Sequence, residues 1–218
     1  MSHRNRLPDW GERLKLLVIT ERVKELGRDH LDVAEAALHG GCRAIQFRDK
    51  EIADRAFVEA ARGIQERCLL HGALFFVNDR VDVAAVLDCG VHLGFNDLDV
   101  GLARNVLGPG VIIGYSPETL SEASREVAVG ADYLGIGPVF STVTKPDAGE
   151  AIGLDGLARM CNADLAPVLG VGGITVENAA EVAQAGASGI AVVTAVTRAK
   201  DMQAATEALL KAFDSAVR

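Results

Sequence analysis

Short apolar runs recur along the chain and are separated by longer segments in which apolar residues follow helical spacing. We predict eight strands from these runs, at residues 15–20, 44–47, 74–77, 91–93, 111–114, 133–137, 168–171 and 190–193. The runs are almost wholly apolar and do not alternate with polar positions, which is typical of parallel strands buried on both faces. Strand and helix therefore alternate along the whole chain.

The segments between the runs are predicted to be helices with one apolar stripe each. Two stretches carry the helical spacing clearly, namely Phe57, Ala61, Ile64 and Cys68, and then Leu120, Ala123 and Val127. Eight strand–helix units in roughly 200 residues favour a closed (β/α)₈ TIM barrel over an open doubly wound sheet. The predicted fold class is α/β, with a polar N-terminal segment at residues 1–12 and one barrel domain at residues 13–218.

The composition narrows the range of partners. The 218 residues carry a formal net charge of -8, and Lys and Arg are scattered without basic runs, which argues against nucleic acid and against anionic membranes. No segment approaches the roughly 20 apolar residues of a membrane span, so we expect a cytoplasmic protein that binds small anionic molecules. The four cysteines are widely spaced and are interpreted as reduced packing residues. The number of subunits is left open, a homo-oligomer included.

Polar and charged residues gather where the predicted strands end, and in a barrel of this kind active sites are built at those carboxyl ends. The amino ends carry mostly Gly and Ala. His92 is the one histidine in a predicted strand, and such a lone histidine is more often structural than a ligand. The residues at the carboxyl ends are Gln46, Arg48, Asp49, Lys50, Asn78, Asp79, Arg80, Asn96, Asp97, Ser116 and residues 137–145, which end in Lys145.

These ends predict an anion site with a metal ion. Asp79 and Asp97 are expected in the same mouth, where two acids beside a polyanion make sense chiefly as Mg²⁺ ligands. The alternative is that each acid pairs with a neighbouring arginine, for example Asp79 with Arg80 or Arg48. The cations expected to converge on this mouth of an acidic protein are Arg48, Lys50, Arg80 and Lys145.

A second anion site is predicted after the seventh strand, at residues 170–175. Gly172 and Gly173 would let backbone amides approach a phosphate, and the helix expected from about Val176 would add its N-terminal dipole. Thr194 and Ala195 after the eighth strand would complete the cup. A plain tight turn is the alternative. Two phosphate-type sites without a Cys/His or Ser/His pair suggest group transfer with a phosphate leaving group.

Seven short motifs, in order, resemble the thiamine phosphate synthase family over about residues 14–197. They are Gln46-x-Arg48-x-Lys50; Asn78-Asp79-Arg80; residues 90–94 (GVHLG) with Asp97; Gly114-x-Ser116; residues 137–145 (GPVFSTVTK); residues 172–175 (GGIT); and residues 191–195 (AVVTA). The resemblance implies condensation of hydroxymethylpyrimidine pyrophosphate with a thiazole phosphate, giving thiamine phosphate and pyrophosphate with Mg²⁺ as cofactor.

The resemblance also implies roles for individual residues. Asp79 and Asp97 would bind the metal. Lys145, Arg48 and Ser116 would take part in the chemical step, with Ser116 near the reacting centre. The pyrophosphate would be held by Gln46, Arg48, Lys50, Asn78 and Lys145, and the thiazole phosphate would face Thr142, Thr144, Gly173 and Thr194.

The chain departs from the family pattern at Phe95, where glutamine is usual, and at Tyr115, where valine is common. Both departures bear on how the pyrimidine fits. The competing hypotheses are a related thiazole tautomerase, a non-catalytic barrel that binds phosphate ligands, and another phosphate-binding barrel isomerase or lyase. The tautomerase uses a histidine shortly after the fifth strand, where this chain has Ser116 to Thr119.

Overall fold

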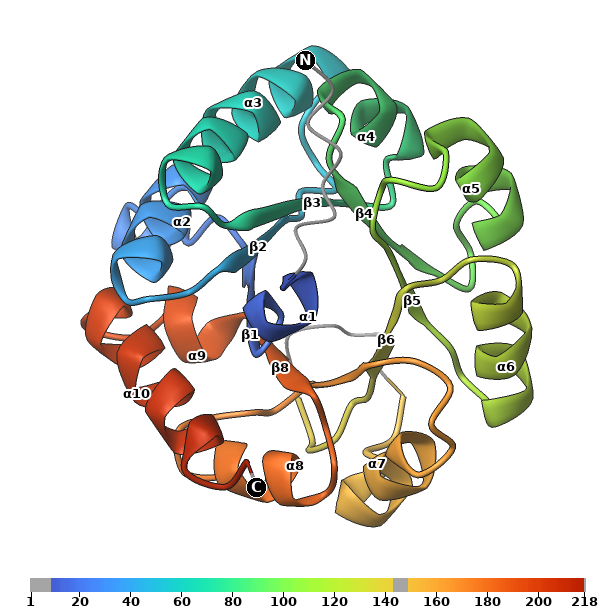
Figure 1. Ribbon diagram of the computed structural model, residues 1–218. Helices are drawn as coiled ribbons and strands as arrows, with labels where there is room; N and C mark the ends of the chain where they lie inside the picture. Colours follow the sequence, from blue (N-terminus) through green and yellow to red (C-terminus); the bar gives the residue numbers. More distant parts are fainter. Residues whose placement is uncertain (1–8, 143–148, 218) are drawn as a thin grey trace.

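The chain forms a closed barrel of parallel strands surrounded by helices (Figure 1); the computed structural model describes residues 9–142 and 149–217. Each strand pairs with the next along the chain, and β8 closes the ring on β1 with Leu17 opposite Ala191. The predicted (β/α)₈ TIM barrel is confirmed, and each predicted strand lies within two residues of its observed bounds. The strands are β1 (Leu16–Thr20), β2 (Ala44–Phe47), β3 (Leu74–Asn78), β4 (Gly90–Gly94), β5 (Ile113–Ser116), β6 (Tyr133–Ile136), β7 (Val168–Val171) and β8 (Gly189–Val192).

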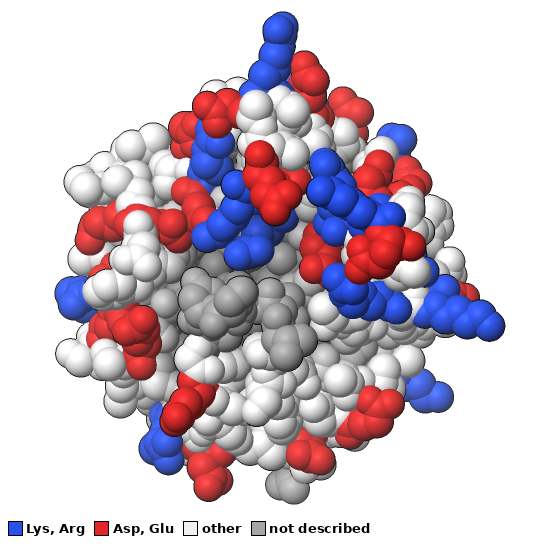
Figure 2. Space-filling view, turned by 180° about the vertical axis from the view of Figure 1, so that it is seen from behind, with Lys and Arg blue, Asp and Glu red and all other residues white. Residues whose placement is uncertain are grey.

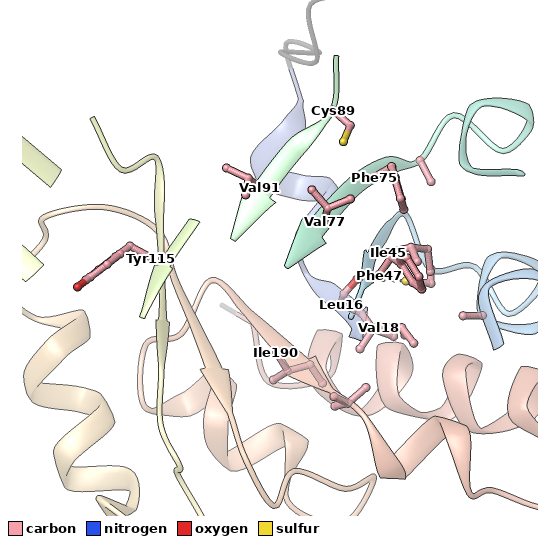
Figure 3. Packing of buried hydrophobic residues seen from close by; sticks show 14 of the residues in the cluster. Leu16, Val18, Ile45, Phe47, Phe75, Val77, Cys89, Val91, Tyr115 and Ile190 are labelled. Atoms are coloured by element: carbon pink, nitrogen blue, oxygen red, sulfur yellow. Dashed lines mark hydrogen bonds between the residues drawn. The ribbon is translucent and has the colours of Figure 1, made fainter. Parts of the chain in front are cut away.

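The helices form the outer layer and bury one stripe each against the strands. On α3 the buried residues are Phe57, Ala61, Ile64 and Cys68, as the helical spacing predicts. Figure 3 shows part of this layer, with Phe47, Val77 and Ile190 among the buried apolar side chains. The helices are α1 (Trp10–Arg13), α2 (His30–His39), α3 (Asp54–Leu70), α4 (Val81–Leu87), α5 (Val100–Leu107), α6 (Leu120–Ala128), α7 (Gly153–Cys161), α8 (Ala179–Gln184), α9 (Thr194–Thr197) and α10 (Met202–Asp214), with a short 3-10 turn at Lys24–Leu26.

The stripe predicted for α6 is only partly right. Ala123 is buried, but Leu120 is 47% exposed, and Glu122 and Glu126 face inward instead. The cause is Tyr115, which extends away from β5 toward the helix layer (Figure 3) and donates a hydrogen bond to Glu122. A buried hydroxyl needs a partner, and a carboxylate on the inner face of α6 provides it.

The barrel interior is filled by large side chains that lie opposite glycines. Phe76 and Tyr133 pack edge to face with their ring centroids 5.7 Å apart. A Cβ atom at Gly114 would stand 2.5 Å from Nδ1 of His92, so only glycine leaves room there. At the amino end, Trp10 of α1 packs against the interior cluster and covers the opening in front of the strands (Figure 1). The boundary predicted at residue 12, between the polar N-terminal segment and the barrel domain, stays a prediction.

Candidate active site

The carboxyl ends of the strands meet on the face opposite to α1. Figure 2 shows this face, where Lys and Arg side chains lie beside Asp and Glu around its centre. Successive residues of a strand alternate between interior and exterior. Because Ala44, Phe76 and Ile112 are interior residues, the inward series continues to Gln46 and Arg48, to Asn78, and to Ser116. The alternation therefore carries these predicted site residues to the mouth.

A cavity of about 730 Å³ opens at the ends of β4 to β8. Ser116, Thr142, Gly173 and Thr194, all predicted to bind substrate, are among its lining residues. We call this group the cavity side. The predicted pyrophosphate and metal residues lie beside it, at the ends of β2 to β4, and are not part of its lining; we call this group the charged side. Its members are Gln46, Arg48, Lys50, Asn78, Asp79 and Asp97.

The charged side brings Asp79, Asp97 and Lys50 together from three consecutive loops. Lys50 Nζ lies 3.3 Å from Asp79 Oδ2, and Asp97 Oδ2 accepts a 2.7 Å hydrogen bond from the Gly94 amide. Asp79 has a φ of 65°, a left-handed conformation that is uncommon for a residue with a side chain. Burial raises the pKa of Asp79, and the neighbouring Asp97 carboxylate raises it further, against the opposing effect of Lys50.

The Asp79 and Asp97 carboxylates repel each other when both are charged, and a divalent cation between them would relieve this repulsion. A bound cation would stabilise both in their charged form, and Mg²⁺ typically takes one or two carboxylates together with substrate phosphate oxygens and water. The part of the chain that the structure describes holds no cluster of three or more His, Cys, Asp or Glu suited to a metal. A cation held by this pair would take its remaining ligands from phosphate oxygens and water.

Arg80 does not join this cluster. Its guanidinium donates to Asp54 at 2.8 Å and to Asp82 at 2.6 Å, and it stacks over the Phe57 ring. The alternative that Asp79 pairs with Arg80 is thereby contradicted. The expectation that Arg80 faces the anion is wrong for the same reason, because two acids at the starts of α3 and α4 already bind it. Sequence position alone cannot show this competition.

Asp49, between Arg48 and Lys50, anchors the loop after β2. Its Oδ1 accepts the amides of Glu51 at 2.8 Å and Ile52 at 3.2 Å, and its Oδ2 lies 3.1 Å from Nε2 of His30. Burial alone would raise the pKa of Asp49, but these hydrogen bonds outweigh it and lower the pKa. The anchor was not singled out from the sequence, because His30 approaches from a helix that is distant along the chain.

The anchor continues into β1. Nδ1 of His30 lies 2.9 Å from the Thr20 hydroxyl, and burial lowers the pKa of His30 against the opposing effect of Asp49. Arg22 adds a longer contact of 3.8 Å to Asp49. The loop that carries Arg48 and Lys50 is thus tied to the first strand and to the start of α2.

The two glycines of the predicted phosphate cup are in place, but the helix that follows them begins later than predicted. Gly172 and Gly173 have φ values of 92° and 67°, and a Cβ at Gly173 would stand 2.7 Å from Cβ of Phe140. Helix α8 begins at Ala179, three residues later than expected. Asn178 delays it, because its side chain accepts the Thr175 amide at 2.8 Å and donates to the Gly173 carbonyl at 3.0 Å. The predicted cup would therefore rest on the half-buried backbone of Gly172 and Gly173 and not on a long helix dipole.

Ser116 is hydrogen-bonded inside the barrel. Its Oγ lies 2.8 Å from Nε2 of His92, whose Nδ1 lies 3.0 Å from the Tyr133 hydroxyl. Tyr133 is fully buried, and burial raises its pKa, while a hydrogen bond from the Gln46 side chain lowers it. His92 is thus held by protein partners, in keeping with its structural interpretation. Ser116 and His92 nevertheless form a hydrogen-bonded Ser/His pair, which corrects the prediction that the chain has no such pair. Tyr133 was missed, although the inward alternation from Tyr133 to Gly135 could have placed it.

The two departures from the family pattern lie in different places. Phe95 lines the cavity with 63% of its surface exposed, so it is positioned to contact a ligand. Tyr115 points out of the barrel to Glu122, so its bearing on the pyrimidine is not supported. Thr144 and Lys145 lie outside the described residues, and their predicted roles stay predictions.

Comparisons with known proteins match the chain along most of its length. The family model for thiamine monophosphate synthase matches residues 16–196. The thiamine-phosphate synthase of Chloroflexus aurantiacus is 45% identical over 92% of this chain and 91% of its own length. The thiamine biosynthesis bifunctional protein ThiM/ThiE of Symbiobacterium thermophilum is 48% identical, and the match spans 93% of this chain but 42% of that longer protein.

Among solved structures, thiamine phosphate pyrophosphorylase from Pyrococcus furiosus superposes with a TM-score of 0.87 at 40% identity, covering 95% of this chain and 99% of that one. The matches confirm the family, activity and transferase class that the motifs predicted. They do not address the metal or individual site residues. The chain belongs to the thiamine monophosphate synthase family.

Proposed function

We propose that this site condenses hydroxymethylpyrimidine pyrophosphate with a thiazole phosphate and releases pyrophosphate. The observation that carries the proposal is the meeting of Asp79, Asp97 and Lys50 beside a cavity. The lining of that cavity includes Ser116, Gly173 and Thr194. The charged side would hold the pyrophosphate, and the cavity side would hold the thiazole phosphate. The thiazole nitrogen and the pyrimidine methylene carbon would then meet between them.

Mg²⁺ is proposed as the cofactor, held by Asp79 and Asp97. When bound, it would neutralise charge that develops on the departing pyrophosphate. Arg48, Lys50 and Lys145 would share this stabilisation, with Gln46 and Asn78 as polar partners. On the other side, Gly173 would offer its backbone, and hydroxyls from Thr142, Thr144 and Thr194 would bind the thiazole phosphate.

The reaction proposed for this site needs no protein nucleophile. Pyrophosphate leaves first and takes the electron pair of the breaking carbon–oxygen bond on its oxygen, and the lone pair of the thiazole nitrogen then forms the bond to the pyrimidine methylene cation. Cys42 and Cys89 offer no nucleophile, because burial raises the pKa of Cys42 to about 11 and of Cys89 to about 12, which keeps both thiols protonated and unreactive. Catalysis then depends on preorganised charge at the leaving group.

The direct test mixes the purified protein with both substrates and Mg²⁺ and measures thiamine phosphate and pyrophosphate. We expect the two products in equal amounts, and no product in the absence of a divalent cation. Binding of both substrates without turnover would instead support the non-catalytic alternative. Product formation at full rate without any divalent cation would contradict the role given to Asp79 and Asp97.

Location and assembly stay proposals as well. None of the helices in residues 9–142 and 149–217 combines the length and apolar character needed to cross a bilayer. We propose a cytoplasmic enzyme whose partners are its small-molecule substrates. The unpaired, mostly buried cysteines suit a reducing compartment. A homo-oligomer stays a prediction that sedimentation of the purified protein would test.

A further inference from the structure

Four polar side chains form a connected path through the barrel interior beneath the cavity. They come from four different strands, and we call them the interior relay. Ser116 Oγ and His92 Nε2 are 2.8 Å apart, and His92 Nδ1 and the Tyr133 hydroxyl are 3.0 Å apart. The Gln46 amide completes the path at Tyr133, and it is only 2% exposed.

The barrel is shaped to hold this path. A Cβ at Gly135 would stand 3.1 Å from both Cε1 of His92 and Oγ of Ser116, and one at Gly114 would stand 2.5 Å from Nδ1 of His92. These glycines on β5 and β6 leave the space that the imidazole occupies. At this level of the barrel, polar side chains take the place of apolar packing. Their hydrogen bonds to one another offset the free-energy cost of burying polar groups.

The path has a direction, because each member has a limited set of protons. Burial raises the pKa of Tyr133, and the hydrogen bond with the Gln46 side chain opposes this, so the Gln46 amide nitrogen is the donor to the Tyr133 oxygen. The Tyr133 hydroxyl then donates a hydrogen bond to Nδ1 of His92, so this nitrogen is the acceptor. Neutral imidazole carries its one proton on Nε2 and donates it to Ser116. The Ser116 proton is left to point into the cavity.

We propose that the interior relay holds His92 as the neutral Nε2–H tautomer and so presents Ser116 to the pyrimidine substrate as a hydrogen-bond donor. The proposal rests on the proposed function. It deepens that function by making His92 and Tyr133 positioning residues that act through Ser116. Donor polarity suits this substrate, since pyrophosphate oxygens and pyrimidine ring nitrogens only accept hydrogen bonds.

A pair of matched tyrosine substitutions tests the relay. Tyr133→Phe removes one hydroxyl from the relay, and Tyr115→Phe removes one hydroxyl that bonds to Glu122 outside the barrel. We expect Tyr133→Phe to lower kcat about tenfold, the effect of losing one buried hydrogen bond, with little change in KM for the thiazole phosphate. Tyr115→Phe should leave kcat within about twofold. Equal effects of the two substitutions on kcat would overturn the proposal.

A double-mutant cycle separates positioning from packing. If His92 acts through Ser116, then His92→Ala should cost little further kcat in a Ser116→Ala background, so the two losses are strongly non-additive. Multiplying losses would show that His92 acts independently and would sink the relay. Thermal unfolding of each variant identifies any loss that comes from misfolding.

Nitrogen NMR of the imidazole gives a readout that needs no turnover. We expect His92 in the unliganded protein to show one neutral tautomer with the proton on Nε2, and Tyr133→Phe to introduce the other tautomer. A proton on Nδ1 in the unsubstituted protein would refute the relay even if the enzyme is active. Absence of thiamine phosphate formation with the Nε2–H tautomer present would contradict the proposed function and not the relay's direction.

Discussion

Asp49→Asn tests whether the loop that presents Arg48 and Lys50 is held by its buried anchor. The substitution keeps the shape of the side chain, and its carbonyl oxygen can still accept the amides of Glu51 and Ile52. It removes the charge, so the bond to His30 changes from charge-assisted to neutral. Charged hydrogen bonds contribute about 1.5–3 kcal/mol and neutral ones about 0.5–1.5 kcal/mol, so we expect a loss of about 1–2 kcal/mol at His30.

The contact of Asp49 with Arg22 adds little. It spans 3.8 Å, and the Arg22 side chain is 44% exposed, so its loss should cost less than about 1 kcal/mol. A total of about 2 kcal/mol corresponds to a fall in Tm of about 4–8 °C for a chain of this size. A looser Arg48–Lys50 loop should also raise KM for the pyrimidine pyrophosphate more than it lowers kcat.

How the Tm loss of Asp49→Asn depends on pH follows from the direction in which the folded protein shifts the pKa of Asp49. Because the folded protein lowers the pKa of Asp49, its contribution is fully present above the ordinary carboxyl value of 3.8 and is lost as pH falls through the lowered folded value. The difference in Tm between Asp49→Asn and the unsubstituted protein should therefore be constant near neutrality. Below the ordinary imidazole value of 6.5 the difference should first grow, because loss of Asp49 lowers the pKa of His30 further. The contribution of the Asp49 charge itself should shrink only in acid, below the ordinary carboxyl value.

Asp82→Asn is the matched control, because Asp82 also binds a guanidinium at the end of a strand but lies outside the anchor. Its side chain is 64% exposed, so we expect a loss below about 1 kcal/mol and an unchanged KM. Thermal scans and initial rates with varied pyrimidine pyrophosphate measure both effects. An Asp49→Asn protein with normal Tm and normal KM would refute the reasoning.

Three other variants, one of them a double substitution, test the proposed site. Asp79→Asn combined with Asp97→Asn should abolish the Mg²⁺ dependence of the rate, and an unchanged metal titration would contradict the assignment. Lys145→Ala should lower turnover by about 10² or more, the scale for removing one charge-stabilising donor, whereas near-normal turnover would exclude that role. Phe95→Gln should change the affinity for the pyrimidine more than that for the thiazole phosphate, and paired binding titrations giving equal changes would refute this.

The barrel could be predicted because its strands are buried on both faces. Runs such as 74–77 and 168–171 are apolar throughout, and glycines such as Gly130 after α6 and Gly186 after α8 turn the chain toward the next strand. Period-two alternation then fixes which residues reach the mouth, so Arg48, Asn78 and Ser116 follow from the strand positions. The local sequence was sufficient to predict positions and side-chain directions that depend on a single strand or helix.

Two of the failures involve partners from other elements. Arg80 was expected at the anion site, but Asp54 at the start of α3 binds it. The apolar face predicted for α6 was displaced by Glu122, because a tyrosine on β5 needs an acceptor beneath that helix. In both cases the decisive contact joins residues whose proximity exists only in the fold. Hydrophobic spacing predicts which face of a helix is buried on average. A single buried hydrogen bond is enough to bring a different face inward.

The mouth separates two tasks that the proposed chemistry keeps apart. On the charged side, Asp79 and Lys50 come from loops whose side chains set the local charge, and these suit a leaving group that gains charge as it departs. On the cavity side, Gly173 offers backbone without added charge, which suits a phosphate that only has to be held. Ser116 stands on β5 between the two, and its partner His92 is on β4, the strand that leads to Asp97. A hydrogen-bond donor at this boundary would contact the pyrimidine substrate, which in the proposed reaction loses pyrophosphate on one side and bonds to the thiazole on the other. We therefore expect the direction of the Ser116 hydrogen bond to affect kcat more than binding of the thiazole phosphate.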